Sequence, residues 1–443
     1  MIRSDVRKEI ESVLNARRLI YTSSNPSSRA ANDAAATFLP GGNTRSVLHY
    51  DPFPLVIARG RGNEVWDLDQ HRYADFVGEF SAGLYGHSDQ IIAEAVKTAV
   101  TNGMVLGGPT EAEALLAGAV VERFPSVDVL RFCNSGTEAN LMALVTATAI
   151  TGKRKILAFR EAYHGGVLVL SASGLETNVP FDFAFAEYNE VDATAGMIRA
   201  LRDELGAVIV EPVLGAAGNI PGTPEFLGML RQETGTANIP LIFDEVKTSR
   251  CGPGGIQGEL NIRPDLTTLG KYLGGGLSSG AFGGRRDLMQ RFDPRHPSPL
   301  RHAGTFNNNP CSMAAGYAGL TNVFTARRAR QFHDDCERFR QTLNSEFAAR
   351  RHPIYCIGSG SMFSIHFSWR KISNPRDIPP ESRMLGRLLH MELLLSGLLI
   401  AARGDVFVML PCLSEHLEEL RSGLLGFPDE HRNLITRSLE AVA

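Results

Sequence analysis

The 443-residue sequence lacks the features that mark several large classes of protein. Its longest strongly apolar stretch, Leu393–Ala402, is about half as long as a membrane-spanning helix and contains Ser396 and Gly397, so we expect buried core there. Basic residues are not in excess, because 45 Lys and Arg stand against 48 Asp and Glu, and a nucleic-acid partner is not expected. Low-complexity tracts and internal repeats are absent from the sequence. These absences favour an ordinary globular protein.

The spacing of the cysteines is also informative. Six are scattered along the chain, without CxxC pairs and without histidines at metal-binding spacing. This pattern predicts reduced, mostly buried thiols and no metal site. The N-terminus carries charged residues before any apolar run, which is the wrong order for a secretory signal. We expect a cytoplasmic protein. A weak internal targeting signal is the alternative that the sequence leaves open.

The chain does contain an alternation of helical and strand patterns typical of an α/β fold. A helix or two are predicted in the first 36 residues, and then an antiparallel meander of three short strands. From about Gly86, helical runs alternate with short apolar segments, which predicts a mostly parallel sheet with crossover helices. The meander strands are expected at 55–59, 64–67 and 72–76, and the sheet strands at 129–132, 155–159, 207–210 and 240–243.

The length favours two domains built from three segments of the chain. Residues 1–85 are expected to contribute to a small domain and residues 86–323 to form a large domain. Residues 324–443, with charged helices and a short strand pattern, are expected to form the C-terminal α+β part of the small domain.

Polar groups follow the predicted sheet strands, where ligands bind in parallel sheets. After 129–132 comes Asn134-Ser135-Gly136-Thr137-Glu138-Ala139, which opens a helix and could cradle a phosphate. Helix capping alone would explain the same residues. After 155–159 comes Tyr163-His164-Gly165-Gly166, a flat aromatic followed by glycines that leave room for a ligand, although such a pair usually serves packing.

Two further groups complete the set. Asp244 follows 240–243, and Lys271 follows the short segment Thr267-Thr268-Leu269-Gly270. Taken alone, this aspartate could be a cap or a metal ligand, and this lysine could be an ordinary surface residue. The order of all four groups favours a phosphate-bearing cofactor, and the sequence has no GxxxxGK[ST] and no GxGxxG after its first strand.

With these motifs in this order, the chain from about Pro40 to Arg403 resembles the class III, fold-type I pyridoxal-phosphate aminotransferases. The resemblance implies that Lys271 forms the Schiff base with the cofactor and then carries the proton, while Asp244 keeps the ring nitrogen protonated. It also implies a homodimer with shared active sites, in which Thr305 reaches the phosphate bound by the partner subunit. The other implied cofactor contacts are Ser135, Gly136 and Thr137 at the phosphate, Tyr163 and Val246 on the two ring faces, and Glu211 near the Schiff base.

Within that family the sequence is most similar to the branch of β-amino-acid (β-phenylalanine type) aminotransferases and glutamate-1-semialdehyde aminomutases. This similarity implies that Arg45, in the segment 40–47 that ends at Val47, anchors a substrate carboxylate, and that Arg403 serves a second carboxylate. Either arginine could instead form a plain ion pair. Phe80 stands where close relatives carry a tyrosine, which makes the expected substrate pocket more apolar.

Lys247 is the other departure from the family pattern, since relatives usually place Gln or Met there. We expect its amine to point inward, where its charge should stabilise the phenolate of the cofactor and lower the aldimine pKa; an amine that points outward would do nothing.

The sequence therefore predicts a ping-pong aminotransferase that moves the amino group of an amino acid, expected to be a β-amino acid, to 2-oxoglutarate or pyruvate. An aminomutase, which needs no external keto acid, is the alternative within the enzyme class. A non-catalytic pyridoxal-phosphate-binding homodimer is the other alternative, and both Lys271 and Asp244, whose loss would mark it, are present.

Overall fold

The computed structural model describes residues 4–171 and 174–440 and is built around a large mixed sheet. Its seven strands lie in the order β4-β12-β11-β10-β7-β5-β6. They run parallel except for β12, which is antiparallel to both of its neighbours, so the predicted α/β fold with a mostly parallel sheet is confirmed. The strands are β4 (Val129–Cys133), β5 (Lys155–Phe159), β6 (Asp182–Ala186), β7 (Leu205–Val210), β10 (Leu241–Asp244), β11 (Leu266–Gly270) and β12 (Gly280–Gly284).

Helices cover this sheet because each crossover between parallel strands must bury an apolar face. Helix α5 packs on β11 and β12, α7 packs on β10, and α6 packs on β6 and α7. The helices of this part of the chain are α3 (Gln90–Asn102), α4 (Glu111–Arg123), α5 (Gly136–Thr151), α6 (Val191–Ala200), α7 (Pro224–Thr236), α8 (Gly255–Leu260), α9 (Arg286–Met289) and α10 (Pro310–Ala318).

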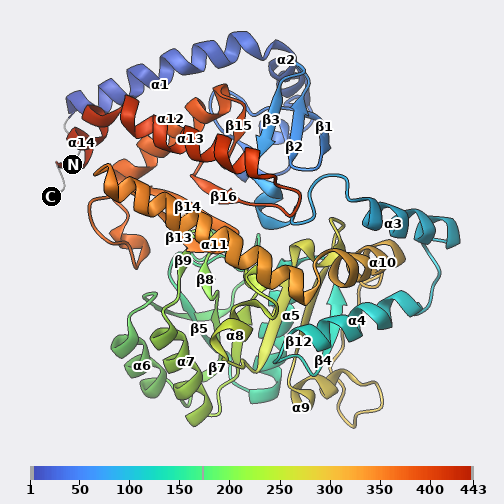
Figure 1. Ribbon diagram of the computed structural model, residues 1–443. Helices are drawn as coiled ribbons and strands as arrows, with labels where there is room; N and C mark the ends of the chain where they lie inside the picture. Colours follow the sequence, from blue (N-terminus) through green and yellow to red (C-terminus); the bar gives the residue numbers. More distant parts are fainter. Residues whose placement is uncertain (1–3, 172–173, 441–443) are drawn as a thin grey trace.

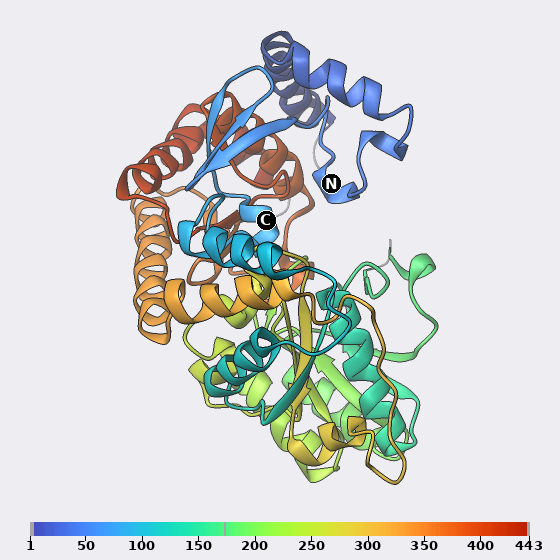
Figure 2. The same cartoon turned by 90° about the vertical axis from the view of Figure 1, so that its right-hand side faces the viewer.

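The two ends of the chain lie together beside the large sheet (Figures 1 and 2). The predicted antiparallel meander is present, and β15, from near the C-terminus, adds to it in parallel beside β3. Helix α1 packs against α12 and α14. The bounds are α1 (Ser4–Ser24), α2 (Pro26–Ala35), β1 (Ile57–Arg61), β2 (Glu64–Asp67), β3 (Arg72–Asp75), β15 (Leu398–Leu399), α12 (Pro380–Leu395), α13 (Ser414–Glu430) and α14 (Arg432–Glu440).

A third sheet, in the order β13-β14-β16, brings the C-terminal part of the chain to the edge of the large sheet. A short hairpin of β8 and β9 follows β7, and β9 packs against β13. These elements are β8 (Val213–Leu214), β9 (Ile220–Pro221), α11 (Ala326–Ala349), β13 (Ile354–Ser359), β14 (Met362–Phe367) and β16 (Asp405–Phe407). The division of the chain at residues 85 and 323 stays a prediction.

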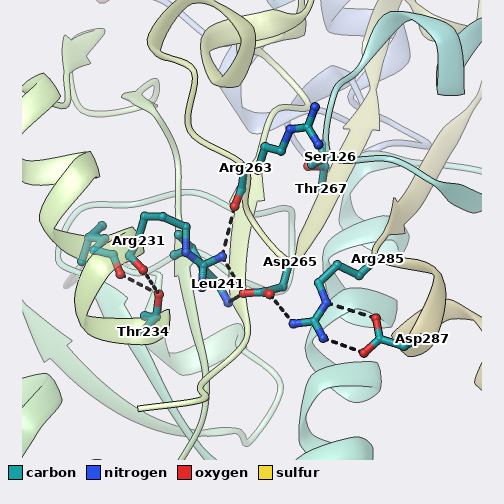
Figure 3. Close-up of polar contacts among 10 residues, drawn as sticks. Ser126, Arg231, Thr234, Leu241, Arg263, Asp265, Thr267, Arg285 and Asp287 are labelled. Carbon is teal, nitrogen blue, oxygen red and sulfur yellow. Dashed lines mark hydrogen bonds and ion pairs between the residues drawn. The ribbon is translucent and has the colours of Figure 1, made fainter. Parts of the chain in front are cut away.

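At the edge of the sheet where β10 and β11 begin, Asp265 joins several elements (Figure 3). Its carboxylate accepts hydrogen bonds from the backbone N–H of Leu241 (2.9 Å) and from Nη1 of both Arg231 and Arg285 (2.8 Å each). The side chain of Asp265 is buried. Because Lys271 follows the other end of β11, this cluster supports the sheet from the edge remote from the predicted site.

The expected burial of 393–402 is confirmed, since Leu393, Leu394, Leu398 and Ile400 are all buried. All six cysteines are free, and five of them are buried. Within residues 4–171 and 174–440, no helix is long and apolar enough to cross a membrane.

Candidate active site

Lys271 lies at the carboxyl end of β11, where the sequence placed it. Its backbone is left-handed (φ 55°), and its Nζ donates a 3.0 Å hydrogen bond to the backbone carbonyl of Phe80. Burial lowers the pKa of this amine to about 8, with Asp244 opposing the shift and the positive charge of Arg403 adding to it. A substantial share of the amine is therefore neutral near pH 8, which a nucleophile and proton acceptor requires.

Asp244 ends β10, and its buried carboxylate accepts several hydrogen bonds, including one from Thr268 Oγ1 (3.5 Å). Asn140 Nδ2 and His164 Nδ1 each approach Oδ2 at 2.8 Å, and the N–H of Val246 approaches Oδ1 at 3.0 Å. Asn140 comes from α5 and was missed by sequence reasoning, because an asparagine inside a helical pattern carries no signal of its own. His164 was noticed only as part of the Tyr163 motif, where its position after a strand was the available signal.

The segment after β4 opens α5, as predicted. Ser135 caps the helix by accepting a hydrogen bond from the N–H of Glu138 (3.1 Å), so the capping interpretation holds for its oxygen. The first-turn N–H groups of Gly136 and Thr137 have no acceptor within the helix, which leaves them for an anion. Gly136 is required here, because a Cβ would lie 2.6 Å from Val246 Cγ1. The capping and anion-binding interpretations are therefore compatible.

Tyr163 and Glu211 are joined near the same strand ends. The N–H of Tyr163 donates to Glu211 Oε1 (2.9 Å), and the N–H of Gly215 donates to Oε2 (3.0 Å). Burial raises the pKa of Glu211, with His164 opposing the shift and Asp244 adding to it. The side chain of Tyr163 is 44% exposed, so its ring is open to a ligand.

A strained turn brings the predicted substrate residues to Lys271. Glu79, Phe80 and Ser81 all have positive φ (48°, 51° and 78°), which is costly for residues with a side chain and marks a constrained site. The guanidinium carbons of Arg45 and Arg403 each lie 5.6 Å from the centroid of the Phe80 ring. Both arginines therefore lie near the residue whose carbonyl holds the Lys271 amine.

Both arginines also take part in ion pairs, as the plainer interpretation expected. Arg45 pairs with Glu79 on a half-exposed surface, and Arg403 Nε pairs with the buried Asp405. Arg403, Phe80 and Val47 line a cavity of about 740 Å³. Its size suits a small acid.

Lys247 points inward. Its Nζ donates to Asn219 Oδ1 (2.6 Å) and lies 4.8 Å from the centroid of the Phe407 ring. Burial lowers its pKa to about 7, while Asp405 opposes the shift and Arg403 adds to it.

Thr305 is exposed and lines a different cavity, beside Met104–Leu106. The same loop is tied to the start of α5, since Asn134 Nδ2 donates to Asn307 Oδ1 (2.9 Å). The structure of one chain thus gathers Ser135, Gly136, Thr137, Tyr163, Glu211, Asp244, Val246 and Lys271 at the strand ends, and leaves Thr305 outside this group.

The gathered residues fit pyridoxal phosphate by their chemistry. The N-terminus of α5 offers free N–H groups to a phosphate, and Asp244, held by Asn140 and His164, can pair with a protonated ring nitrogen. Tyr163 and Val246 come from different loops, so a flat ring can lie between them, and the Lys271 amine is free to react with an aldehyde.

Comparison with known proteins gives the class of this site. Residues 46–428 match the family model described as "Aminotransferase class-III". The chain is 45% identical to the β-phenylalanine transaminase of Variovorax paradoxus over 94% of this chain and 96% of that protein. A solved β-phenylalanine aminotransferase from Variovorax paradoxus superposes with a TM-score of 0.94, covering 96% of this chain and 99% of that one.

Two further relatives widen the comparison. The glutamate-1-semialdehyde 2,1-aminomutase 2 of Exiguobacterium sibiricum is 36% identical over 80% of this chain and 84% of that protein. A structure described as a transaminase with PLP bound is 27% identical, with a TM-score of 0.84, and covers 94% of this chain and 99% of that one. The chain belongs to the class III aminotransferases. The predicted pyridoxal-phosphate-dependent aminotransferase of fold-type I is thereby confirmed.

Proposed function

We propose that this aminotransferase moves the amino group of a β-amino acid to a keto acid such as 2-oxoglutarate or pyruvate, as a homodimer with shared active sites. The observation that carries the proposal is the placement of Arg45 and Arg403 next to the ring of Phe80, whose carbonyl holds the Lys271 amine. The whole-chain similarity to a β-phenylalanine transaminase supports the same substrate class.

Different residues would bind the cofactor and transfer the proton. Gly136, Thr137 and the helix dipole of α5 hold the cofactor phosphate, and Tyr163 packs on the ring. When bound, pyridoxal phosphate supplies an electron sink for the electron pair left on the amine-bearing carbon. Asp244 would hold the proton on the ring nitrogen, and the Lys271 Nζ would serve as the base that accepts the proton from the substrate carbon and as the acid that gives a proton back.

The residues proposed to contact the substrate determine which acids the site accepts. Arg45 holds the carboxylate of the β-amino acid, which lies one carbon farther from the reacting centre than in an α-amino acid, and Val47 and Phe80 form an apolar wall for its side chain. Arg403 serves the second carboxylate of a dicarboxylic keto acid. An acceptor with one carboxylate and an acceptor with two can therefore use the same cavity.

The test is to mix the purified yellow protein with β-phenylalanine or α-phenylalanine, with and without 2-oxoglutarate or pyruvate. We expect β-phenylalanine to bleach the cofactor absorbance and sustained turnover to need the keto acid. Turnover without any keto acid would identify the aminomutase alternative, which the similarity to glutamate-1-semialdehyde aminomutases makes the second candidate. A cofactor band that no amino donor bleaches would identify a non-catalytic binding protein.

The arginine assignment predicts that Arg45→Ala raises the KM for the β-amino acid about tenfold or more, because a charged carboxylate contact is lost. The cofactor should remain bound, since Arg45 does not contribute to the phosphate or ring contacts. Steady-state kinetics on β-phenylalanine measure the effect. Arg59→Ala is the matched control, because Arg59 stacks on Trp66 in the N-terminal meander. Equal kinetics for the Arg45 variant and the parent would refute the role.

A further inference from the structure

The cavity wall behind Arg403 contains a connected set of polar side chains that the proposed reaction does not use. Lys247 Nζ donates to Asn219 Oδ1 (2.6 Å). Asn219 Nδ2 donates to Ser364 Oγ (2.8 Å) and to Asp405 Oδ1 (3.3 Å), and Ser364 Oγ donates to the same Asp405 oxygen. Asn219, Ser364 and Asp405 are all buried. A hydrogen-bonded path therefore links the Lys247 amine to the Asp405 carboxylate.

The two oxygens of Asp405 differ in how they are satisfied. Oδ1 accepts from Ser364 and Asn219, whereas Oδ2, among the residues that the structure describes, accepts only from Arg403 Nε. The Asp405 side chain is 1% exposed, and that of Arg403 is 39% exposed. Arg403 is therefore a partly exposed partner for a buried carboxylate. If Arg403 turns to a substrate carboxylate, a buried negative charge loses its counter-ion, which proteins avoid.

We propose that Lys247 is the reserve counter-ion of Asp405: when Arg403 turns from Asp405 to a second substrate carboxylate, Lys247 takes up a proton and balances the charge that Arg403 leaves behind. The step makes and breaks no covalent bond other than the N–H bond formed on Lys247, and the proton comes from solvent. The inference rests on the proposed function, in which the cavity accepts acids with one and with two carboxylates. Lys247 is then a positioning residue that acts through Asp405 and Arg403.

The charges around Lys247 give the direction of the change. With Arg403 on Asp405, burial and the positive charge of Arg403 lower the pKa of Lys247 to about 7, and Asp405 opposes them. Burial opposes ionisation of Asp405, yet Arg403 and Lys247 together hold its pKa below the usual range. When Arg403 moves away, its positive charge no longer repels the Lys247 ammonium, and the negative charge of Asp405 is no longer neutralised by Arg403. Both changes raise the pKa of Lys247.

The other groups that face this amine do not replace it. Lys271, from the end of β11, repels it, and Glu211, from the end of β7, attracts it. His366 Nε2 on β14 donates to the carbonyl of Gly218 (2.8 Å), next to Asn219, and burial lowers the pKa of its ring. The face of the Phe407 ring, 4.8 Å from Nζ, favours the charged form of the lysine. Lys247 is thus the group beside Asp405 that is placed to gain a proton near neutral pH.

The test measures proton uptake on binding, without turnover. Glutarate has two carboxylates but neither an amine nor a keto group, and 3-phenylpropionate has one carboxylate. Each is titrated into the holoenzyme at about pH 7.5, where an amine of pKa about 7 is about three quarters neutral. Calorimetry in phosphate and in Tris buffer, which differ in ionisation enthalpy, gives the number of protons taken up. We expect glutarate to take up about half a proton or more beyond any uptake with 3-phenylpropionate.

Two variants separate the proposed role from a structural one. Lys247→Met should abolish the extra uptake and weaken glutarate binding about tenfold, while 3-phenylpropionate binding changes less than about twofold. Lys247→Arg keeps a fixed charge, so it should bind glutarate without the extra uptake. Lys155→Met, which changes an exposed lysine on β5 paired with Asp182, is the matched control and should behave as the parent.

Several results would overturn the inference: no glutarate binding, equal proton uptake for the two acids, or unchanged uptake in Lys247→Met. If glutarate behaves as expected but β-phenylalanine is not transaminated, the substrate proposal fails and the charge-balancing role of Lys247 stands. The two failures are therefore distinguishable.

Discussion

At the scale of single residues, the site is defined by two strained backbone positions that face each other. Lys271 and Phe80 are both left-handed, and a hydrogen bond from the Lys271 amine to the Phe80 carbonyl joins them. Such conformations persist only where the surroundings over-determine them. Here Gly270, at whose position a Cβ would lie 3.3 Å from both Gly136 and Val246, packs the end of β11 against the start of α5. The amine is thus aimed by the backbone as well as by its hydrogen bond.

The lowered pKa of Lys271 predicts how the apoenzyme recombines with pyridoxal phosphate. Only the neutral amine attacks the aldehyde, so the rate constant should rise about tenfold per pH unit below pH 8 and level off above it. Stopped-flow absorbance after mixing measures the rate. Arg403→Met removes a positive charge that lowers this pKa, so its profile should level off at a higher pH. A parent profile that keeps rising to pH 10 would contradict the assignment.

The site residues predicted from the sequence lie at strand ends, whereas a residue that was missed lies within a helix. Lys271, Asp244 and Tyr163 follow strands, and the end of a strand in a parallel sheet is a predictable place. Asn140 lies within α5 and becomes important only because the packing of α5 on the sheet sets it 2.8 Å from Asp244. The inward direction of Lys247 agrees with the expectation, although residues 245–247 leave the strand and the alternation of its side chains does not extend to them.

At the scale of elements, the alternation of apolar segments predicted most of the large sheet, and a glycine-rich strand was among those missed. The strand β12, Gly-Ala-Phe-Gly-Gly, has little strand propensity, so no pattern predicted it. Its glycines are required by close approach: a Cβ on Gly280 would lie 2.2 Å from the carbonyl oxygen of Ser135. The close packing that requires these glycines beside the proposed phosphate-binding turn therefore also removes the pattern that would have predicted the strand. Strand β6 was missed as well, and β1 begins two residues later than predicted, at Ile57.

The Asp265 cluster yields a prediction about the stability of the sheet. Asp265→Ala removes the acceptor shared by Leu241 N–H, Arg231 and Arg285, and should lower the free energy of unfolding by about 2 kcal/mol, because a buried N–H and two guanidinium groups lose their partner. Asp287→Ala removes an exposed partner of the same Arg285 and should change stability by less than about 0.5 kcal/mol. Thermal unfolding followed by circular dichroism, with cofactor bound, measures both. Equal losses in the two variants would show that burial of the Asp265 carboxylate does not matter.

At the scale of the whole molecule, the surface around Thr305 carries a group of exposed apolar side chains. Val105 is 82% exposed, and Met104, Leu106 and Phe306 are more than half exposed. These side chains line one cavity with Thr305, next to the loop that contacts Asn134. An exposed apolar group of this kind favours association. Its position beside the phosphate-binding turn supports the proposed homodimer with shared sites, which composition alone could not predict.

The homodimer proposal predicts that charge in this apolar patch separates the subunits and loosens the cofactor together. Val105→Glu buries a carboxylate in the interface if two copies meet there, so sedimentation should show a shift from about twice the 48.2 kDa chain mass toward the single-chain mass. Because Thr305 is proposed to contact the phosphate held by the partner subunit, the same variant should lose pyridoxal phosphate on dialysis. Leu413→Glu, at another exposed apolar residue, is the matched control and should stay dimeric and yellow. Monomers that retain the cofactor as firmly as the parent would refute the shared site, because each subunit would then hold the phosphate alone.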